Sequence, residues 1–201
     1  MKKSLDIPQK HKQRLYPVVL ELLSQNDFHQ VNIRTICKKS GLSLGTIYKY
    51  FSSKEEILFR IIEEHIRNIF ELQRLHIQGL QSSKEIFRKL LWVTLDYYDK
   101  NTNVAVAAFI TVPTRTWMQQ DNYKLGHEPF DIFLTEAHQR GDIHPDIDIR
   151  RLQDIFYMIC YRIIHSWYYF GRKWKLVEAM NQDFDIFWRM LSPEPLTSRD
   201  L

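Results

Sequence analysis

Apolar residues recur at helical spacing along most of the chain, and short polar or glycine-containing stretches separate the periodic segments. The first segment covers residues 15–23. Pro17 lies near its start, and proline is tolerated only in the first turn of a helix. We therefore expect this helix to begin near residue 14 or to be kinked at the proline. Asn26 and Asp27 tolerate left-handed backbone conformations, so we expect them to end the helix.

Polar residues that can cap a helix N-terminus mark three further helices. Their expected ranges are residues 33–39, 44–50 and 54–78. The side chains that can accept hydrogen bonds from the first free N–H groups are those of Asn32, Ser43 and Ser53. Glu56, three residues after Ser53, completes a capping-box pattern. Gly41 suits the turn between the first two of these helices because glycine accepts a positive φ.

The remainder of the chain also has helical periodicity. The expected ranges are residues 82–99, 103–118, 128–140, 148–170 and 175–191. Pro113 lies inside the second of these, where we expect a kink or a break. The chain has only six glycines and no strand-like alternation of any length, which favours helices. The prediction is an all-α fold of about nine helices.

Composition narrows the class of protein. No apolar run approaches the roughly 18 residues that span a bilayer. The N-terminus has basic residues with no apolar core after them, so we expect a cytoplasmic protein without membrane contact. Cys37 and Cys160 lie far apart and are expected to be reduced packing thiols. The histidines show no metal-ligand spacing, so neither a metal site nor a cofactor is expected.

Positive charge is concentrated near the N-terminus. Residues 1–55 hold ten Lys and Arg against four Asp and Glu, a net charge of +6, which leaves −2 for the rest of a chain whose total is +4. This imbalance suggests a polyanionic partner for the N-terminal part alone. The expected division is a basic head, residues 1–52, and a larger helical body, residues 53–201, with DNA binding expected for the head from its helix-turn-helix layout and effector binding and dimerisation expected for the body from its aromatic and apolar helices.

The two short helices and the turn between them have the layout of a helix-turn-helix. In this arrangement the second helix enters the major groove of DNA while the first crosses the backbone. The helix over residues 44–50 would present small or polar groups on its outer side. Gly45 lets the backbone approach DNA closely. Thr46, Tyr48 and Lys49 can donate hydrogen bonds to phosphates or base edges.

This part of the chain resembles the DNA-binding signature of the TetR (TetR/AcrR-type) family. The residues that carry the resemblance are Phe28, Asn32 to Arg34, Gly41 to Phe51 and Lys54 to Leu58. The resemblance implies phosphate contacts by Asn32, Thr46, Tyr48 and Lys54. It also implies contacts with base edges or the groove wall by Arg34, Leu44, Gly45, Lys49 and Tyr50. The chain departs from the family pattern at Val18, Val19, Asp27 and Thr35, which concerns helix ends and local packing.

The body is rich in large aromatic residues. On any single helix such residues are more often core than ligand contacts. As a set they suggest a cavity for a small apolar or aromatic effector with few polar anchors. The candidate effector-binding residues are Trp92, Phe109, Arg115, Trp117, Phe133, Tyr161 and His165.

The helix expected over residues 148–170 is apolar on nearly all sides, and a helix of that kind is buried all round. Such a helix would be buried if one of its sides packed on the core of its own chain and the other side packed on a partner subunit. The candidate dimer-interface residues on this helix and the next are Ile155, Ile159, Ile163, Trp167, Phe184, Phe187 and Trp188. A two-fold dimer through these helices also agrees with what the TetR resemblance implies.

These features predict a DNA-binding transcriptional regulator, most simply a homodimeric repressor. Such a dimer would bind double-stranded operator DNA with two recognition helices in successive major grooves, about 34–36 Å or slightly more apart. A small-molecule effector would release it by favouring a state in which this spacing no longer matches. Activation in place of repression stays open.

Two other classes were weighed against a regulator. An enzyme would use Arg115, Glu136 and His138 for acid–base chemistry, but no nucleophile is paired with a base at an informative spacing. An interaction protein would have a helix-turn-helix that no longer binds DNA. The polar outer side of residues 44–50 and the +6 charge argue against that reading. The prediction is therefore a regulator without enzymatic activity.

Overall fold

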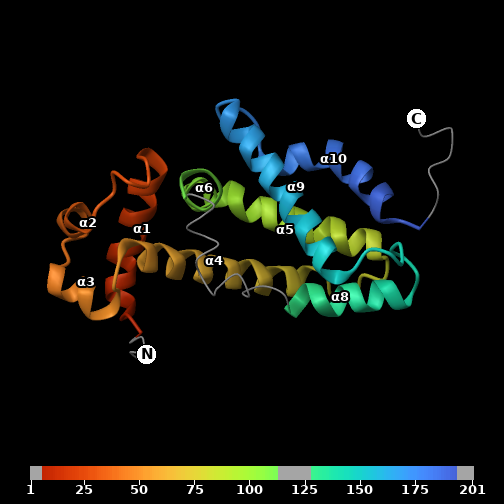
Figure 1. Cartoon of the computed structure of the whole chain (residues 1–201), viewed down its shortest axis with the longest axis horizontal. Coiled ribbons are helices and arrows are strands. Elements are labelled where there is room, and N and C mark those ends of the chain that lie inside the picture. Colours follow the sequence, from red (N-terminus) through yellow and green to blue (C-terminus); the bar gives the residue numbers. More distant parts are fainter. Residues whose placement is uncertain (1–5, 113–127, 194–201) are drawn as a thin grey trace. The chain divides into compact units, whose positions relative to one another are not determined.

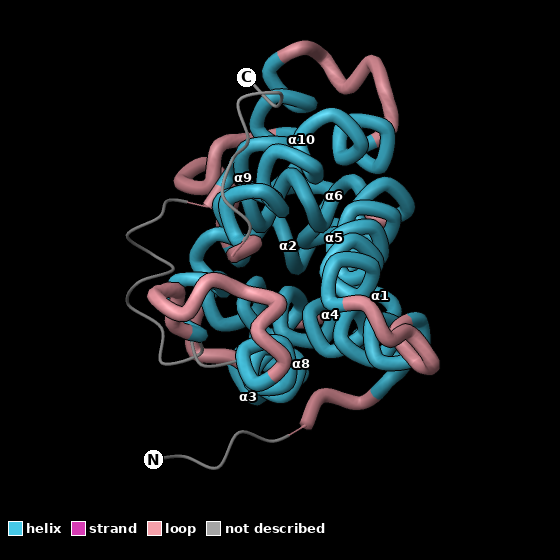
Figure 2. The backbone as a smooth tube through the Cα atoms, turned by 90° about the vertical axis from the view of Figure 1, so that its right-hand side faces the viewer, coloured by secondary structure: helices cyan, strands magenta, loops and turns pink. Residues whose placement is uncertain are grey.

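The structure is a computed structural model that describes residues 6–112 and 128–193 (Figure 1). Within these residues all regular secondary structure is helical, with nine α-helices and one short π-helix (Figure 2). This result confirms the prediction of an all-α fold. Among the described residues no helix combines the length and the apolar character that a bilayer crossing requires.

The helix bounds follow the expected ranges closely. The helices before residue 101 are α1 (Gln9–Gln25), α2 (Ile33–Ser40), α3 (Leu44–Tyr50), α4 (Lys54–His76) and α5 (Ser83–Lys100). The later ones are α6 (Thr102–Val106), the π-helix η1 (Ala107–Thr111), α8 (Glu128–Gln139), α9 (Ile149–Tyr169) and α10 (Leu176–Leu191).

Helix α1 differs from its prediction at both ends. It begins at Gln9, after Pro8, so a start near residue 14 is wrong, and Pro17 lies inside the helix. Pro17 is exposed, so water can bond the carbonyl group that proline leaves without a helical partner. The left-handed ending is also wrong, because Asn26 is extended, with φ −135°. Its backbone N–H and its side-chain amide both donate to Leu22 O instead, at 3.1 and 2.8 Å.

The expected sixth helix is interrupted at Val112, next to the break expected at Pro113. It covers α6 and η1, and Val112 then has an extended backbone with φ −79° and ψ 123°. The residue before a proline is pushed towards extended backbone, which explains why the helix ends at Thr111, two residues before Pro113. The last residues of the predicted range, 113–118, lie outside the described part.

The chain divides into two compact units. The first comprises Met1–Ile66 and Asn101–Tyr123, and the second comprises Arg67–Lys100 and Lys124–Leu201. Helix α4 runs without interruption from the first unit into the second. Compactness and function are different properties, so the functional division at residues 52 and 53 stays a prediction.

Helix α1 is the centre of the first unit. It packs against α2, α6 and η1, and Figure 1 shows α1, α2 and α3 lying close together. Thr111 Oγ1 donates a hydrogen bond to Leu23 O at 2.7 Å, which joins η1 to α1. The described apolar residues that are almost fully buried in this unit include Leu15, Val19, Leu23, Ile36, Ile47, Phe51, Ile57 and Leu58.

Helix α5 is the centre of the second unit. It packs against α9 and α10, and α8 packs on α9. The Phe87 ring on α5 lies 5.6 Å from that of Phe156 and 6.1 Å from that of Phe184, both measured between ring centroids. Asp99 accepts hydrogen bonds from the backbone N–H groups of Leu176 and Val177, at 2.8 and 3.2 Å. A side chain near the end of α5 therefore caps the first turn of α10.

Candidate nucleic-acid interface

The turn between α2 and α3 depends on Gly41. Its backbone has φ +65°, a left-handed conformation that favours glycine. A Cβ atom at this position would lie 2.4 Å from Arg14 Nη2, and that same nitrogen donates a hydrogen bond to Gly41 O at 2.9 Å. Arg14 on α1 therefore holds the turn, and glycine is the residue that leaves room for it.

Both helices of the motif begin at the predicted caps. Asn32 Oδ1 accepts a hydrogen bond from the Thr35 N–H at 3.0 Å, and Ser43 Oγ accepts one from the Thr46 N–H at 3.1 Å. Asn32 and Ser43 are both exposed and have the extended backbone typical of an N-cap residue. These bonds fix the start of each helix and so set which side chains of α3 face outward.

Helix α3 has one buried and one exposed side. Ile47 is 1% exposed and anchors the helix in the core, whereas Leu44 is 44% and Tyr48 53% exposed. Gly45 and Lys49 are exposed as well. A Cβ atom on Gly45 would meet only Ser43 Oγ, at 4.0 Å, so the fold of this chain does not require glycine there. A close external partner would explain it.

The other predicted DNA contacts lie around this exposed side. Arg34 on α2 is exposed, and Thr46 and Tyr50 are half-buried. Thr46 Oγ1 lies 2.8 Å from Ser43 Oγ, so these two hydroxyl groups share a hydrogen bond. Lys49 Nζ lies 5.5 Å from the ring centroid of Tyr50. The face therefore offers a cation, hydroxyl groups and aromatic rings together, which suits phosphates and base edges.

Lys54 is placed differently from the other predicted contacts. Its ammonium group donates hydrogen bonds to Phe28 O at 2.6 Å and Val31 O at 2.9 Å, and it lies 4.4 Å from the ring centroid of Phe28. An ammonium group has three donors, so one is left for a phosphate. Lys54 thus also ties the start of α4 to the segment between α1 and α2.

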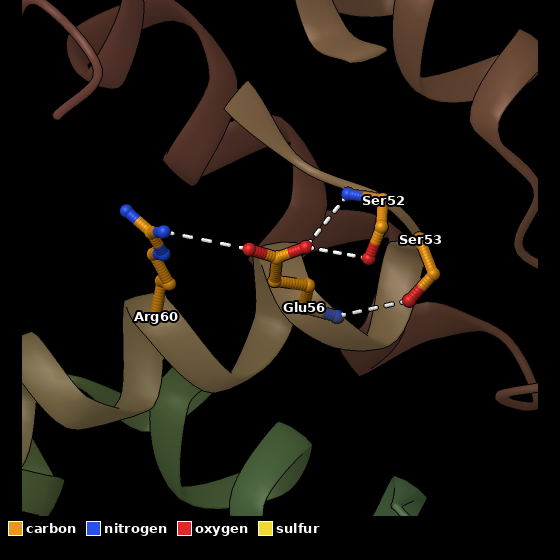
Figure 3. A network of polar contacts seen from close by, with 4 residues as sticks. All are labelled: Ser52, Ser53, Glu56 and Arg60. Atoms are coloured by element: carbon orange, nitrogen blue, oxygen red, sulfur yellow. Dashed lines mark hydrogen bonds and ion pairs between the residues drawn. The ribbon is translucent and has the colours of Figure 1, made fainter. Parts of the chain in front are cut away.

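A polar network surrounds the start of α4 (Figure 3). The Glu56 N–H donates to Ser53 Oγ at 3.2 Å, as a capping box requires. The reciprocal half of the predicted box is wrong. Glu56 Oε2 accepts from the backbone N–H and the hydroxyl of Ser52, both at 2.6 Å, because Ser52 precedes the helix and has both donors free.

The charge of Glu56 is stabilised by this network. Its other oxygen faces Arg60 Nη2 at 3.4 Å. Burial alone would raise the pKa of the Glu56 carboxyl, but the hydrogen bonds from Ser52 and Arg60 together lower that pKa below its usual value. Glu56 therefore joins the end of α3 to α4 as a carboxylate.

The candidate effector residues are distributed over both compact units and a segment outside the described residues. Arg115 and Trp117 lie outside the described residues. Phe109, on η1, belongs to the first unit, and Phe133 is buried on α8 in the second. Trp92, half-buried on α5, has its ring centroid 6.3 Å from that of His76, with the two ring planes tilted by 44°.

Tyr161 and His165 form a pair of their own on α9. Their rings stack with centroids 3.9 Å apart, and Tyr161 is 48% exposed. They therefore lie on an outward side of α9, whereas a pocket inside the second unit would need buried side chains.

The candidate dimer residues fall mostly inside one chain. Ile159, Ile163, Trp167 and Phe184 are at most 3% exposed, while Ile155, Phe187 and Trp188 are half-buried. The first four are buried within the chain itself, and their part in an interface stays a prediction. The large apolar side chains that α9 and α10 leave exposed are those of Tyr157, Met158, Tyr161, Tyr168, Tyr169, Ile186 and Met190.

Sequence reasoning also missed a polar pair inside the second unit. Gln73 on α4 is 1% and Thr94 on α5 is 6% exposed, and Gln73 Nε2 donates to Thr94 Oγ1 at 2.9 Å. The spacing indicates the burial of Gln73, though not its partner, because Gln73 continues the apolar series Ile62, Ile66 and Ile69 on α4.

Of the three residues named for acid–base chemistry, Arg115 lies outside the described residues. Glu136 and His138 lie two positions apart on α8, and residues at that spacing do not share a helix face. Among the described residues, no three His, Cys, Asp or Glu side chains come together in a way that could hold a metal ion.

Comparison with known proteins points to one family. Residues 19–61 match the family model described as "Bacterial regulatory proteins, tetR family". The fatty acid metabolism regulator protein of Bacillus subtilis is 23% identical over 183 residues, which cover 86% of this chain and 91% of that protein. The matched segment contains α2, α3 and the start of α4, the elements that build the exposed face described above.

Two solved structures share the fold. The crystal structure of the transcriptional regulator FadR from Bacillus subtilis, in complex with stearoyl-CoA, aligns with a TM-score of 0.78 at 21% identity and covers 89% of this chain and 98% of that one. The fatty acid degradation regulator FadR from Bacillus halodurans also gives a TM-score of 0.78, at 17% identity, and covers 92% and 96% of the two chains. Residues 19–61 therefore match the helix-turn-helix segment of the TetR family, and the chain shares the all-helical fold of these solved transcriptional regulators.

Proposed function

We propose that the protein is a homodimeric repressor that a long-chain fatty acyl compound releases from double-stranded operator DNA. The observation that carries this proposal is the exposed side of α3, where Leu44, Gly45, Tyr48 and Lys49 face outward while Ile47 is buried. A helix whose N-terminus is capped by Ser43 and that follows a glycine turn can enter a major groove as a rigid element.

The proposed DNA contacts fall into two groups. Residues assigned to phosphates are Asn32, Thr46, Tyr48 and Lys54, and residues assigned to base edges or the groove wall are Arg34, Leu44, Gly45, Lys49 and Tyr50. Capping does not prevent these roles. Asn32 uses its amide oxygen for the cap, which leaves its NH₂ group as a donor, and Lys54 keeps one of its three donors.

The proposed dimer uses the exposed sides of α9 and α10. Tyr157, Met158 and Tyr161 follow one another at helical spacing on α9, and Ile186 and Met190 do so on α10. An exposed apolar stripe of this kind is typical of a subunit interface. The buried candidates Ile159, Ile163, Trp167 and Phe184 would support the interface from behind without touching the partner.

The proposed effector class rests on the named relatives and on the interior of the second unit. The Bacillus subtilis regulator and the Bacillus halodurans structure are named for fatty acid metabolism and degradation, and the Bacillus subtilis structure holds stearoyl-CoA. The described core around Phe87, Leu90, Leu91 and Leu95 is apolar and suits an alkyl chain. Such an effector acts only if it binds the DNA-free state more tightly than the DNA-bound state.

The experiment that tests DNA reading starts from genomic fragments captured by the purified protein. We expect a pseudo-palindromic site whose affinity falls steeply with salt. Tyr48→Ala should weaken binding to many sequences alike, because it removes a phosphate contact. Lys49→Ala should change the base preference at one position of each half-site. If neither variant alters a gel shift on the captured site, the docking of α3 is wrong.

Separate measurements test the dimer and the effector. Light scattering should show a dimer for the wild type and a monomer for Met158→Asp, while Asp154→Asn, an exposed change on the same helix, should remain dimeric. Adding stearoyl-CoA should release the captured operator. A wild-type monomer at micromolar concentration, or an operator complex that stearoyl-CoA leaves intact, would count against the corresponding part of the proposal.

A further inference from the structure

Gln73 has a buried oxygen without a partner in the described part of the protein. The side chain is 1% exposed and lies on α4 against α5. Its nitrogen Nε2 donates to Leu90 O at 3.2 Å and to Thr94 Oγ1 at 2.9 Å. Its oxygen Oε1 is buried and receives no hydrogen bond there. Buried polar atoms in folded proteins nearly always have a partner, so this atom calls for an explanation.

The neighbours of Gln73 fix which end of its amide group is free. The Thr94 hydroxyl donates its only hydrogen to Leu90 O at 2.9 Å, so towards Gln73 it can only accept. Turning the amide over would bring its oxygen against two acceptors, Leu90 O and Thr94 Oγ1. The unpartnered atom is therefore the oxygen, and the group that completes the site must be a hydrogen-bond donor.

The donor must also be electrically neutral. The buried polar side chains among the described residues are those of Ser40, Gln73, Ser83, Thr94 and Gln153, none of which carries a charge. Burial raises the pKa values of the Tyr98 hydroxyl and the Cys160 thiol above their usual ranges, so both stay protonated. A carboxylate in this interior would find no buried cation in the described part to balance it.

From this geometry we infer that Gln73 Oε1 binds a neutral N–H or O–H group of an otherwise chain-like apolar effector. The inference rests on the proposed function, and it narrows the effector class. A long-chain alcohol or the amide N–H groups in the pantetheine arm of an acyl-CoA qualify, whereas a free fatty acid at neutral pH has a carboxylate and no such donor.

The same arrangement explains how binding acts on α4. The closed interior leaves the acceptor unsatisfied, and a ligand can supply the missing bond only when α4 and α5 separate enough to admit it. The bond therefore forms in one state and not in the other, which is the differential affinity that an allosteric effector needs. Gln73 lies on α4, the same helix that begins at Lys54 after the helix-turn-helix. A change in the position of Gln73 would therefore act on α4 directly.

The test uses two probes with the same alkyl chain, dodecan-1-ol and methyl dodecyl ether, which lacks the donor. Binding to the full-length wild type is measured by calorimetry, and operator release by gel shift. Since the two probes differ in hydration, the decisive quantity is the ratio of their dissociation constants. We expect Gln73→Met to reduce the preference for the alcohol about fivefold to tenfold, the effect of one neutral hydrogen bond in a dry interior.

Gln153→Met is the matched control, because it removes the other buried glutamine of the second unit. It should keep the wild-type ratio. Dodecanoate should bind the wild type more weakly than dodecan-1-ol does. If Gln73→Met does not fold, the wild-type order of alcohol over carboxylate still decides the inference.

The outcomes separate this inference from the proposed function. An unchanged alcohol-to-ether ratio in Gln73→Met, or a carboxylate that binds better than the alcohol, overturns the role of Gln73 alone. If stearoyl-CoA and all the dodecyl probes fail to bind or to release DNA, the proposed effector class is wrong, and the role of Gln73 falls with it.

Discussion

The helix-turn-helix and the interior of the second unit differ in how they use polar side chains. Around α2 and α3, Asn32 and Ser43 each accept a bond from a helix N-terminus, and Arg14 donates to the turn carbonyl of Gly41. Inside the second unit, Gln73 Nε2 and the Thr94 hydroxyl both donate to Leu90 O, and Gln73 Oε1 has no hydrogen-bond partner among the described residues. The polar side chains around α2 and α3 therefore stabilise the helix-turn-helix, whereas the interior of the second unit keeps a buried acceptor without a donor in the described part.

This difference matches the two tasks proposed for the protein. A DNA-reading surface must keep its side chains in place before the partner arrives, because ordering them on binding would weaken the complex. A ligand-sensing interior must instead form favourable interactions with the ligand that are absent from the ligand-free state. Four substitutions test whether the two regions differ in this way, from the largest expected effect to the smallest.

Gly41→Ala should lower the free energy of unfolding by about 2–3 kcal/mol. The new residue would be held at φ +65°, and its Cβ would displace Arg14 from the turn. Urea denaturation measures the loss. Gly141→Ala is the control, because Gly141 also has a positive φ, +73°, but nothing lies within 4 Å of the added atom. Equal losses in both variants would show that the Arg14 contact adds nothing to the turn.

Thr94→Val should lower the free energy of unfolding by about 1–2 kcal/mol, because Gln73 Nε2 would lose one of its two acceptors. Gln73→Met should cost much less or even stabilise the protein, because it removes the unsatisfied oxygen together with the amide. Thermal unfolding of the two variants gives the comparison. A larger loss for Gln73→Met than for Thr94→Val would mean that the oxygen has a partner after all.

Glu56→Gln should destabilise the protein at pH 7 by about 1 kcal/mol, since it weakens the bonds with Ser52 and Arg60. The folded state lowers the pKa of Glu56, so its contribution is present above the usual carboxyl pKa of 4.5 and is lost as the pH falls through the folded value. Denaturation at pH 7 and pH 4 should therefore show a smaller difference between wild type and variant at the lower pH.

Glu55→Gln provides the control for Glu56→Gln. Glu55 lies in the same first turn of α4, so its replacement removes the same charge from the helix N-terminus. A pH dependence of equal size in both variants would assign the effect to the helix dipole, with no contribution from the Ser52 bonds.

Gly45→Ala should raise the free energy of unfolding by about 0.5–1 kcal/mol, since alanine is the better helix former and the space is free. The same variant should bind operator DNA several-fold more weakly, because the methyl group would hold the backbone of α3 away from the groove wall. Melting and gel-shift measurements at one salt concentration give both numbers. A more stable variant with unchanged affinity would contradict the close approach at this position.

Short-range patterns were sufficient to predict the helix-turn-helix. Asn32, Ser43 and Gly41 act within three or four residues of their own position, so spacing alone predicts their roles, and all three have the expected geometry. The two wrong predictions near the helix-turn-helix, the second half of the capping box and the left-handed end of α1, arose because a neighbouring group offered an alternative hydrogen bond. Ser52 and Ser53 both stood within reach of Glu56, and Asn26 had its own side chain available to end α1 in an extended conformation.

The second unit was predictable only as a set of helices. The pairing of Gln73 with Thr94 joins residues 21 positions apart, and the cap that Asp99 provides for Leu176 joins residues 77 apart. No local spacing shows such contacts. The choice of dimer candidates was uncertain for the same reason. Apolar residues lie on every side of α9, so the sequence does not reveal which side packs inside the chain. The structure assigns that side to Ile159 and Ile163 and leaves Tyr157 and Met158 outside.

The N-terminal end of helix α4 is held by the hydrogen bonds of Lys54. Lys54 and Gln73 stand 19 residues apart on one continuous helix, about 28 Å along its axis. Sliding or rolling of that helix must first detach the Lys54 ammonium from Phe28 O and Val31 O. A ligand that moves the start of α4 would have to offset the loss of these two bonds through its higher affinity for the moved state. The two bonds would therefore set part of the difference in affinity that any effector acting through α4 must supply.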